Sequence, residues 1–245
     1  MGVLVVTGTG TEVGKTVTTA ALAAVAARAG RSVAVLKPAQ TGVAPREPGD
    51  VDEVVRLAGD AVTGVELARY PEPLAPGTAA ARAGLAPVRP EQVAEAVEKL
   101  AASHDLVLVE GAGGLLVRLD AEGSTLADVA GLLAAPVLVV AAAGLGTLNS
   151  VQLTGEALRS RGLRQAGVVI GSWPREPGLA ERCNVADLPV AAGAELLGAV
   201  PAGVGTMSPE AFRSGAGEWL GRELGGVWDG AEFARRAASG EPERP

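Results

Sequence analysis

The feature that most constrains the fold is an alternation of short apolar runs with segments of helical periodicity. The first run leads through a glycine-rich stretch into an Ala-rich segment, and later runs are rich in branched residues that suit strands buried on both faces. We predict strands at Val3–Val6, Ser32–Lys37, Leu106–Val109, Val137–Ala141, Gly167–Ile170 and Glu195–Val200. We predict helices at Lys15–Arg28, Asp50–Leu57, Glu91–Leu100, Leu126–Leu133, Asn149–Arg159 and Pro209–Leu224. Strands that alternate with helices fold as βαβ units, so the sequence predicts an α/β fold with a mostly parallel sheet and helices on both faces.

The length of the chain fits a single α/β domain. The chain has 245 residues and shows no internal repeat. The alternating pattern continues to residue 224, and from Gly225 it gives way to Gly, Ala, Arg, Glu and Pro. We therefore expect one domain over residues 1–224 and a poorly ordered C-terminal tail over residues 225–245.

The composition argues against several classes of partner. The chain carries 21 basic and 28 acidic residues, for a net charge of −7, and has no basic block that could neutralise nucleic-acid phosphates. The uncharged stretch Val129–Gly155 is interrupted by Pro136, and its apolar part is shorter than the about 20 residues of a membrane span. One cysteine and one histidine rule out an internal disulfide and a cluster of thiolate or imidazole metal ligands. We expect a cytoplasmic protein that binds neither nucleic acid nor membranes.

The glycine-rich stretch between the first strand and the first helix predicts a phosphate-binding loop. It reads GTGTEVGKT over residues 8–16. Backbone N–H groups beside glycines and at a helix N-terminus attract phosphate, Lys15 can reach the β- and γ-phosphates, and the Thr16 hydroxyl can bind Mg²⁺. We interpret the stretch as the loop of a nucleoside triphosphate-binding protein, which makes the expected fold one of the P-loop NTPase type. One residue more than in the common motif separates Gly8 from Gly14.

Two other interpretations of this loop stay open. A dinucleotide-binding loop would explain the Gly-x-Gly of residues 8–10, although Gly14 comes one position late and arginines occupy the stretch where an acidic residue is expected. A glycine-rich turn with a helix cap at Thr11 or Thr16 is the other alternative.

Lysine is scarce in this chain, which has 18 arginines and three lysines. Lys15 and Lys37 lie at the carboxyl ends of predicted strands, where open α/β sheets bind ligands, whereas Lys99 lies on a helix face. Lys37 is followed by the polar stretch PAQTG, residues 38–42. A compact ammonium suits an anion or a carbamate oxygen better than a guanidinium does. The alternative for Lys37 is a solvated lysine that closes the strand.

Two acidic residues are candidate magnesium ligands. Glu110 ends the strand Leu106–Val109 and precedes GAGG, residues 111–114. A carboxylate at the end of a buried strand is costly unless it meets a cation, so we interpret Glu110 as a ligand of Mg²⁺, directly or through water. A cap of the following turn is the alternative. Asp50 opens a predicted helix and is either a second ligand or a complement to the helix dipole.

Four segments, in this order, resemble the dethiobiotin synthetase family of ATP-dependent cyclising ligases. They are Thr7–Thr16, Lys37–Pro38 with Thr41–Gly42, Val109–Gly114 and Leu145–Asn149. The additional residue in the phosphate loop is typical of this family. The resemblance extends over about Val3 to Pro201.

The resemblance implies a homodimer that converts 7,8-diaminononanoate, CO₂ and ATP into dethiobiotin, ADP and phosphate with Mg²⁺, through a carbamate and a carbamic–phosphoric anhydride. It implies catalytic roles for Lys37, Lys15 and Thr11, with Lys37 at the carbamate and Lys15 at the transferred phosphoryl group. It implies a magnesium site made by Thr16, Asp50 and Glu110. The implied nucleotide-binding residues are Glu12, Val13, Gly14, Lys15, Thr16, Val17, Asp50, Glu110, Gly111, Ala112, Gly113, Gly171 and Ser172. The implied substrate-binding residues are Lys37, Thr41, Gly146, Thr147, Leu148 and Asn149, of which the last four hold the substrate carboxylate of the partner subunit.

The sequence departs from the family pattern near the purine. Many members carry Asn-Asp after the late strand, where this chain has Gly171 and Ser172, so the preferred nucleotide base stays open. Trp173 is either a platform for the base or a cover for the sheet edge. We favour Asp50 over Asp52 as the metal ligand because it keeps the family's distance to the following helix.

Two other functions share this type of loop. Partitioning ATPases, which act on membranes or DNA, carry a signature lysine at the front of the loop, where this chain has Thr7–Thr9. Amide ligases of the cobyrinate type use a catalytic cysteine, and Cys183 lacks the flanking glycines of a nucleophile elbow. Both are less consistent with the sequence than a dethiobiotin synthetase.

Overall fold

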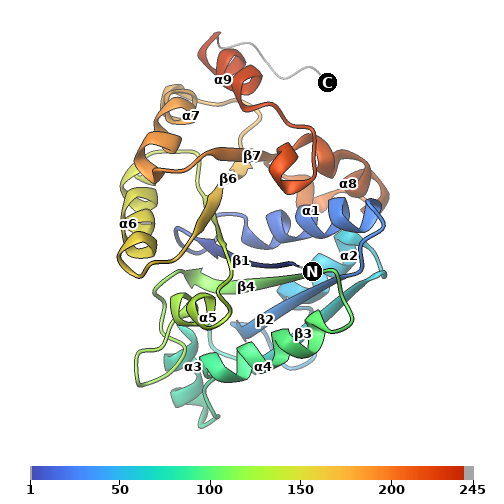
Figure 1. Ribbon diagram of the computed structural model, residues 1–245, viewed down its shortest axis with the longest axis vertical. Helices are drawn as coiled ribbons and strands as arrows, with labels where there is room; N and C mark the ends of the chain where they lie inside the picture. Colours follow the sequence, from blue (N-terminus) through green and yellow to red (C-terminus); the bar gives the residue numbers. More distant parts are fainter. Residues whose placement is uncertain (1, 240–245) are drawn as a thin grey trace.

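A computed structural model describes residues 2–239 of the chain. Within these residues all strands are parallel and form one seven-stranded sheet in the order β3-β2-β4-β1-β5-β6-β7 (Figure 1). The strands are β1 (Gly2–Gly8), β2 (Val33–Thr41), β3 (Val62–Tyr70), β4 (Leu106–Gly114), β5 (Val137–Ala141), β6 (Gln165–Trp173) and β7 (Leu196–Pro201). The helices are α1 (Lys15–Arg28), α2 (Asp50–Ala58), α3 (Pro76–Ala83), α4 (Pro90–Ala101), α5 (Leu126–Leu132), α6 (Thr147–Ser160), α7 (Leu179–Ala192), α8 (Pro209–Gly215) and α9 (Gly230–Ser239).

The sheet separates two hydrophobic cores, because successive side chains of a strand point to opposite faces. In β1, Val5 packs in one core and Val6 in the other. The first core includes side chains of α3 to α7, and the second includes side chains of α1, α2 and α8, which lie on the opposite face in Figure 1. The predicted α/β fold, with one sheet and helices on both faces, is confirmed.

The uncharged stretch Val129–Gly155 is divided among three separate elements. It contains the end of α5, all of β5 and the first part of α6, and every residue of β5 is buried. None of the helices within residues 2–239 is long and apolar enough to cross a membrane.

Besides α9, three elements within residues 2–239, β3, α3 and α7, have no counterpart in the sequence prediction. β3 lies at the edge of the sheet, and it carries Glu66 and Arg69 instead of a continuous apolar run because most of its residues are only partly covered. Helix α3 is short and Ala-rich, and α7 contains Pro189, so neither shows a clear helical pattern in the sequence.

The prediction of one helix over Pro209–Leu224 is wrong. α8 ends at Gly215, and short 3₁₀ turns follow at residues 216–218 and 222–224. Glycines weaken a continuous helix here. Leu220 instead forms an antiparallel β-bridge with Gly198 of β7, the strand at the edge of the sheet. The chain therefore gains a contact with β7 at the expense of helical hydrogen bonds.

Part of the segment expected to be a poorly ordered tail, residues 225–239, forms defined structure. The backbone of Trp228 donates to the Leu220 carbonyl at 3.0 Å, and α9 follows. The Phe233 ring packs edge-on against Trp173, with centroids 5.0 Å apart, and lies 5.3 Å from the Trp228 ring. These aromatic contacts supply apolar burial that the polar tail sequence does not suggest. The last part of the expected tail, residues 240–245, lies outside the described residues.

Candidate active site

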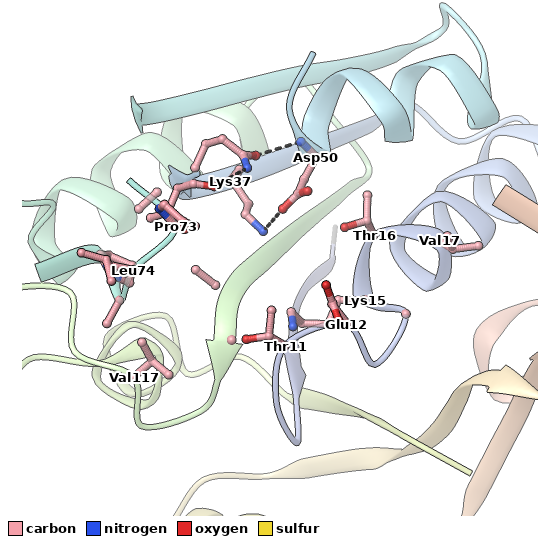
Figure 2. A pocket seen from close by; sticks show the side chains of 18 residues that line it. Thr11, Glu12, Lys15, Thr16, Val17, Lys37, Asp50, Pro73, Leu74 and Val117 are labelled. Atoms are coloured by element: carbon pink, nitrogen blue, oxygen red, sulfur yellow. Dashed lines mark hydrogen bonds and ion pairs between the residues drawn. The ribbon is translucent and has the colours of Figure 1, made fainter. Parts of the chain in front are cut away.

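A pocket of about 730 Å³ lies where β1, β2 and β4 end side by side. Parallel strands present their carboxyl ends at one edge of the sheet, so side chains that are far apart in the sequence meet there. Figure 2 shows Lys37 and Asp50 on one side of this pocket and the phosphate loop with Thr11 and Glu12 on another. The lining residues are Thr11, Glu12, Gly14, Lys15, Thr16, Val17, Lys37, Ala39, Gln40, Thr41, Asp50, Pro73, Leu74, Ala75, Pro76, Ala112, Gly113 and Val117.

The phosphate loop is held in shape by close contact with β6. Gly14 precedes α1 with φ of 92°, a conformation that favours glycine. A Cβ atom on Gly14 would lie 2.1 Å from the Gly171 carbonyl oxygen, and one on Gly171 would lie 2.1 Å from the Val13 carbonyl oxygen. No side chain caps the N-terminus of α1, which leaves its partial positive charge available to an anion.

Lys15 lies in the pocket with its ammonium folded back on the loop. Its Nζ donates a hydrogen bond to the Gly10 carbonyl at 2.8 Å, and the side chain is buried. Burial, together with the nearby Lys37 ammonium, lowers the pKa of Lys15 from its ordinary value of 10.5, although Glu110 and Asp50 act in the opposite direction. The two ammonium groups are therefore close enough to repel each other, and an anion between them would relieve that repulsion.

Lys37 joins two carboxylates from different elements. Its Nζ lies 2.9 Å from Oε1 of Glu110 on β4 and 2.5 Å from Oδ2 of Asp50 on α2. It also donates to the Gly111 carbonyl at 3.1 Å, and Thr16 on α1 donates its hydroxyl to Oε1 of Glu110 at 3.0 Å. Burial alone would lower the pKa of Lys37, but Glu110 and Asp50 outweigh it, so its pKa is raised and the side chain stays an ammonium.

The oxygen atoms around Lys37 suit a magnesium ion. Oε2 of Glu110 is buried and has no hydrogen-bond partner, which is costly for a carboxylate unless a cation is bound. Within residues 2–239 no three His, Cys, Asp or Glu side chains cluster as a complete metal cage. Mg²⁺ commonly takes only one or two carboxylates and completes its six ligands with phosphate oxygens and water. The Thr16 hydroxyl with Asp50 and Glu110 fits that requirement.

An apolar wall faces the charged side of the pocket. It is formed by the segment Pro73–Pro76, which follows β3 and ends at the first residue of α3, and by Val117 after β4. Figure 2 shows Pro73, Leu74 and Val117 together at this end of the pocket. Sequence reasoning missed this wall, because loop residues without charge or regular spacing carry no chemical signal. Gln40, which also lines the pocket, lies on β2, and it was not singled out within the polar stretch that follows Lys37.

The structure brings most of the predicted site residues to this pocket. Gly111 contacts Lys37, and Val13 and Gly171 pack beneath the loop. Ser172 is exposed beside them. Trp173 is 4% exposed and packs against Phe233, and it lies on β6, which is an interior strand and not the edge of the sheet.

One predicted group lies outside the pocket. Gly146, Thr147, Leu148 and Asn149 form the start of α6 and are absent from the pocket lining. Gly146 and Asn149 are exposed, whereas the Thr147 hydroxyl donates to the Ala142 carbonyl at 2.7 Å. Their predicted role toward a partner subunit stays a prediction.

Solved structures share the fold at low sequence identity. The septum site-determining protein MinD complexed with Mg-ADP from Pyrococcus horikoshii matches with a TM-score of 0.53 and 15% identity, over 98% of this chain and 96% of that one. A ParA family ATPase from Chlorobium tepidum matches with a TM-score of 0.55 and 12% identity, over 96% and 97% of the two chains. These similarities confirm the P-loop NTPase type of fold and do not extend to function.

Sequence comparisons identify much nearer relatives. A family model described as an AAA domain matches residues 3–209. The ATP-dependent dethiobiotin synthetase BioD of Streptomyces avermitilis is 71% identical, over 96% of this chain and 98% of that protein. The proteins of the same name from Streptomyces coelicolor and Saccharopolyspora erythraea are 69% and 67% identical, over 96% and 93% of this chain and 99% of each relative. The chain therefore belongs to the ATP-dependent dethiobiotin synthetase family and is a ligase of biotin biosynthesis.

Proposed function

We propose that this ligase joins CO₂ to the two amines of 7,8-diaminononanoate and closes a cyclic urea. One amine adds to CO₂ and loses a proton, which gives a carbamate. A carbamate oxygen then takes the γ-phosphoryl group of ATP and releases ADP. The second amine attacks the carbamoyl carbon, loses a proton and expels phosphate, which yields dethiobiotin.

The observation that supports this reaction best is the presence of Lys15 and Lys37 in one pocket with an apolar wall. Attack of a carbamate on ATP brings two anions together, so the barrier falls where fixed positive charge offsets their repulsion. We assign Lys37 to the carbamate and Lys15 to the transferred phosphoryl group. Thr11 lies in the phosphate loop and lines the pocket, and it is assigned to the same step.

The nucleotide phosphates are assigned to the start of α1, where N–H groups and the helix dipole attract anions. Thr16, Asp50 and Glu110 are the residues that would hold Mg²⁺. When bound, the ion would neutralise charge on the nucleotide phosphates. Asp50 is preferred over Asp52 because it lines the pocket, whereas Asp52 binds the backbone N–H of Gly49 at 2.7 Å.

The aliphatic part of the diamine fits the apolar wall of Pro73–Pro76 and Val117, with Thr41 beside the reacting amines. Its carboxylate is assigned to the start of α6, Gly146–Asn149, in the partner subunit of a homodimer. An uncharged helix N-terminus can bind a carboxylate through its backbone N–H groups. The cytoplasmic location expected from the sequence is part of the same proposal.

A phosphate-release assay tests the reaction. Purified protein is mixed with Mg²⁺, bicarbonate, 7,8-diaminononanoate and ATP, GTP or CTP in turn. We expect phosphate release only when the diamine is present, with dethiobiotin formed in equal amount by mass spectrometry. Release that is independent of the diamine, or that responds to DNA or lipid vesicles, contradicts the proposal.

The lysine variants provide a matched control for this assay. Lys99 is exposed in the last turn of α4 and is absent from the pocket lining. Lys99→Ala is expected to keep the full activity, and Lys15→Ala is expected to lose it. Equal activity of the two variants contradicts the assignment of the site.

A further inference from the structure

Gln40 is a buried polar residue that lines the pocket, and it has no role in the proposed reaction. It lies on β2, three residues after Lys37, and is 4% exposed. In a regular strand, side chains three positions apart point to opposite faces. Both Lys37 and Gln40 nevertheless contact Asp50 at the start of α2, and Pro38 lies between them in the strand. The two side chains therefore act on one residue.

The two contacts hold different parts of Asp50. Lys37 contacts the carboxylate, whereas Oε1 of Gln40 accepts a hydrogen bond from the backbone N–H of Asp50 at 2.8 Å. The Gln40 amide nitrogen donates to the Thr41 carbonyl at 3.3 Å, which fixes the amide with its oxygen toward α2. Gln40 thus sets the position of the backbone from which the Asp50 carboxylate extends.

The start of α2 needs this contact because its N-cap residue has no side chain. The first N–H groups of a helix have no partner within the helix and are usually satisfied by the N-cap side chain. The N-cap residue here is Gly49. A Cβ atom on Gly49 would lie 2.9 Å from Oε1 of Gln40 and 2.9 Å from the Arg69 guanidinium. The glycine therefore makes room for a cap that comes from β2.

We propose that Gln40 is a positioning residue that holds the Asp50 carboxylate opposite Lys37. The Asp50 side chain is 35% exposed, so little packing restrains it apart from Lys37 and the fixed start of α2. Without Gln40, the backbone N–H of Asp50 loses its hydrogen bond to β2, and the Lys37 ion pair alone holds the carboxylate. This inference rests on the proposed role of Asp50 at the magnesium site.

The test compares Gln40→Met with the unchanged chain. Methionine has a similar length and removes both hydrogen-bonding groups. In the protein without ligands, we expect the Asp50 amide hydrogen to exchange about tenfold faster, because this N–H loses its acceptor. In titrations of ADP binding with Mg²⁺ by calorimetry, we expect half-saturation to need about tenfold more Mg²⁺, the lower end of the effect of residues that orient a metal ligand. The nucleotide affinity without Mg²⁺ should stay unchanged.

Gln165→Met is the matched control, because it removes a glutamine amide from the start of β6 and lies outside the pocket lining. It should leave both measurements unchanged. Unchanged Asp50 exchange in Gln40→Met overturns the inference, and so does faster exchange with unchanged Mg²⁺ half-saturation, which would make Gln40 a helix cap alone.

Asp50→Asn separates this inference from the proposed function. If Asp50→Asn keeps the normal Mg²⁺ half-saturation, the proposed magnesium site is wrong. If Asp50→Asn shifts it and Gln40→Met does not, only the positioning role of Gln40 is wrong.

Discussion

Lys37 and Glu110 form a buried ion pair, with Nζ 2.9 Å from Oε1 and side chains that are 3% and 1% exposed. The pair joins β2 and β4, which are neighbours in the sheet. Removing both charges from water is costly, and Thr16 and Gly111 satisfy part of the remaining hydrogen-bonding capacity. A pair of this kind places charge at the pocket and does not by itself imply high stability.

Loss of one member of the pair is expected to destabilise the fold. Lys37→Met leaves the Glu110 carboxylate buried without its cation, and breaking such pairs costs about 3–5 kcal/mol. The double variant Lys37→Met with Glu110→Gln removes the uncompensated charge and should recover most of the loss in urea unfolding at neutral pH. If the double variant is less stable than Lys37→Met, the ion pair is not the source of the cost.

Substitutions of the two lysines of the pocket are expected to differ in their effects on turnover and on ADP binding. Lys37→Ala should lower turnover by at least about a hundredfold, the effect of one removed charge-stabilising donor, while ADP affinity stays largely intact. Lys15→Ala should weaken ADP binding as well, because its ammonium faces the phosphate loop. Steady-state kinetics and calorimetry measure the two effects, with Lys99→Ala as control. Equal loss of ADP binding in both variants contradicts the division of roles.

The affinity for ADP is expected to decline as the pH rises. The decline should begin at a lower pH than it would if Lys15 had the pKa of an ordinary lysine. Binding needs the protonated form of Lys15, whose pKa lies below its ordinary value of 10.5 because of burial and the Lys37 ammonium. Lys37 has a raised pKa and stays charged through the same range. ADP phosphates are already ionised above pH 8, since their last pKa is about 6. Calorimetric titrations from pH 8 to 10.5 should show the decline in the unchanged chain and no decline in Lys15→Ala.

Gly171 is expected to be essential for the shape of the phosphate loop. In Gly171→Ala the new Cβ atom would lie 2.1 Å from the Val13 carbonyl oxygen, so the loop has to move. We expect ADP affinity to fall by about tenfold or more, as each 1.4 kcal/mol of lost binding corresponds to tenfold. Gly131→Ala in α5 is the control, because its new Cβ atom would make only an ordinary contact, 3.8 Å from Leu163. Similar ADP affinity in the two variants contradicts the role of this contact.

The charged part of the site was predictable because Lys37 and Glu110 each follow the apolar run of a strand and Lys15 begins a helix. Lys15 follows β1, Lys37 lies on β2 and Glu110 on β4, and these strands are adjacent. A parallel sheet brings such positions together at one edge, whatever the length of the connections. The chemical type of each residue then indicates a phosphate and metal site.

The rest of the site depends on contacts that carry no local signal. The wall of Pro73–Pro76 and Val117 comes from irregular segments and the first residue of α3, and Gln40 contacts Asp50 only because α2 begins beside it. α9 is fixed by the Phe233 ring against Trp173, 60 positions earlier in the sequence, so its polar composition is misleading. Contacts of this kind are set by packing between distant segments.

The sequence by itself determined the α/β fold, the phosphate loop and the identity of the charged groups, because periodicity and residue chemistry act locally. Only the tertiary structure decided how those groups are held. Lys37 lies between two carboxylates, Gly14 packs against Gly171, and the backbone N–H of Asp50 donates to the amide oxygen of Gln40. Hydrogen bonds and ion pairs require atoms within about 3 Å of each other. The order of residues specifies which groups are present, and the packing of the sheet and its helices sets their distances.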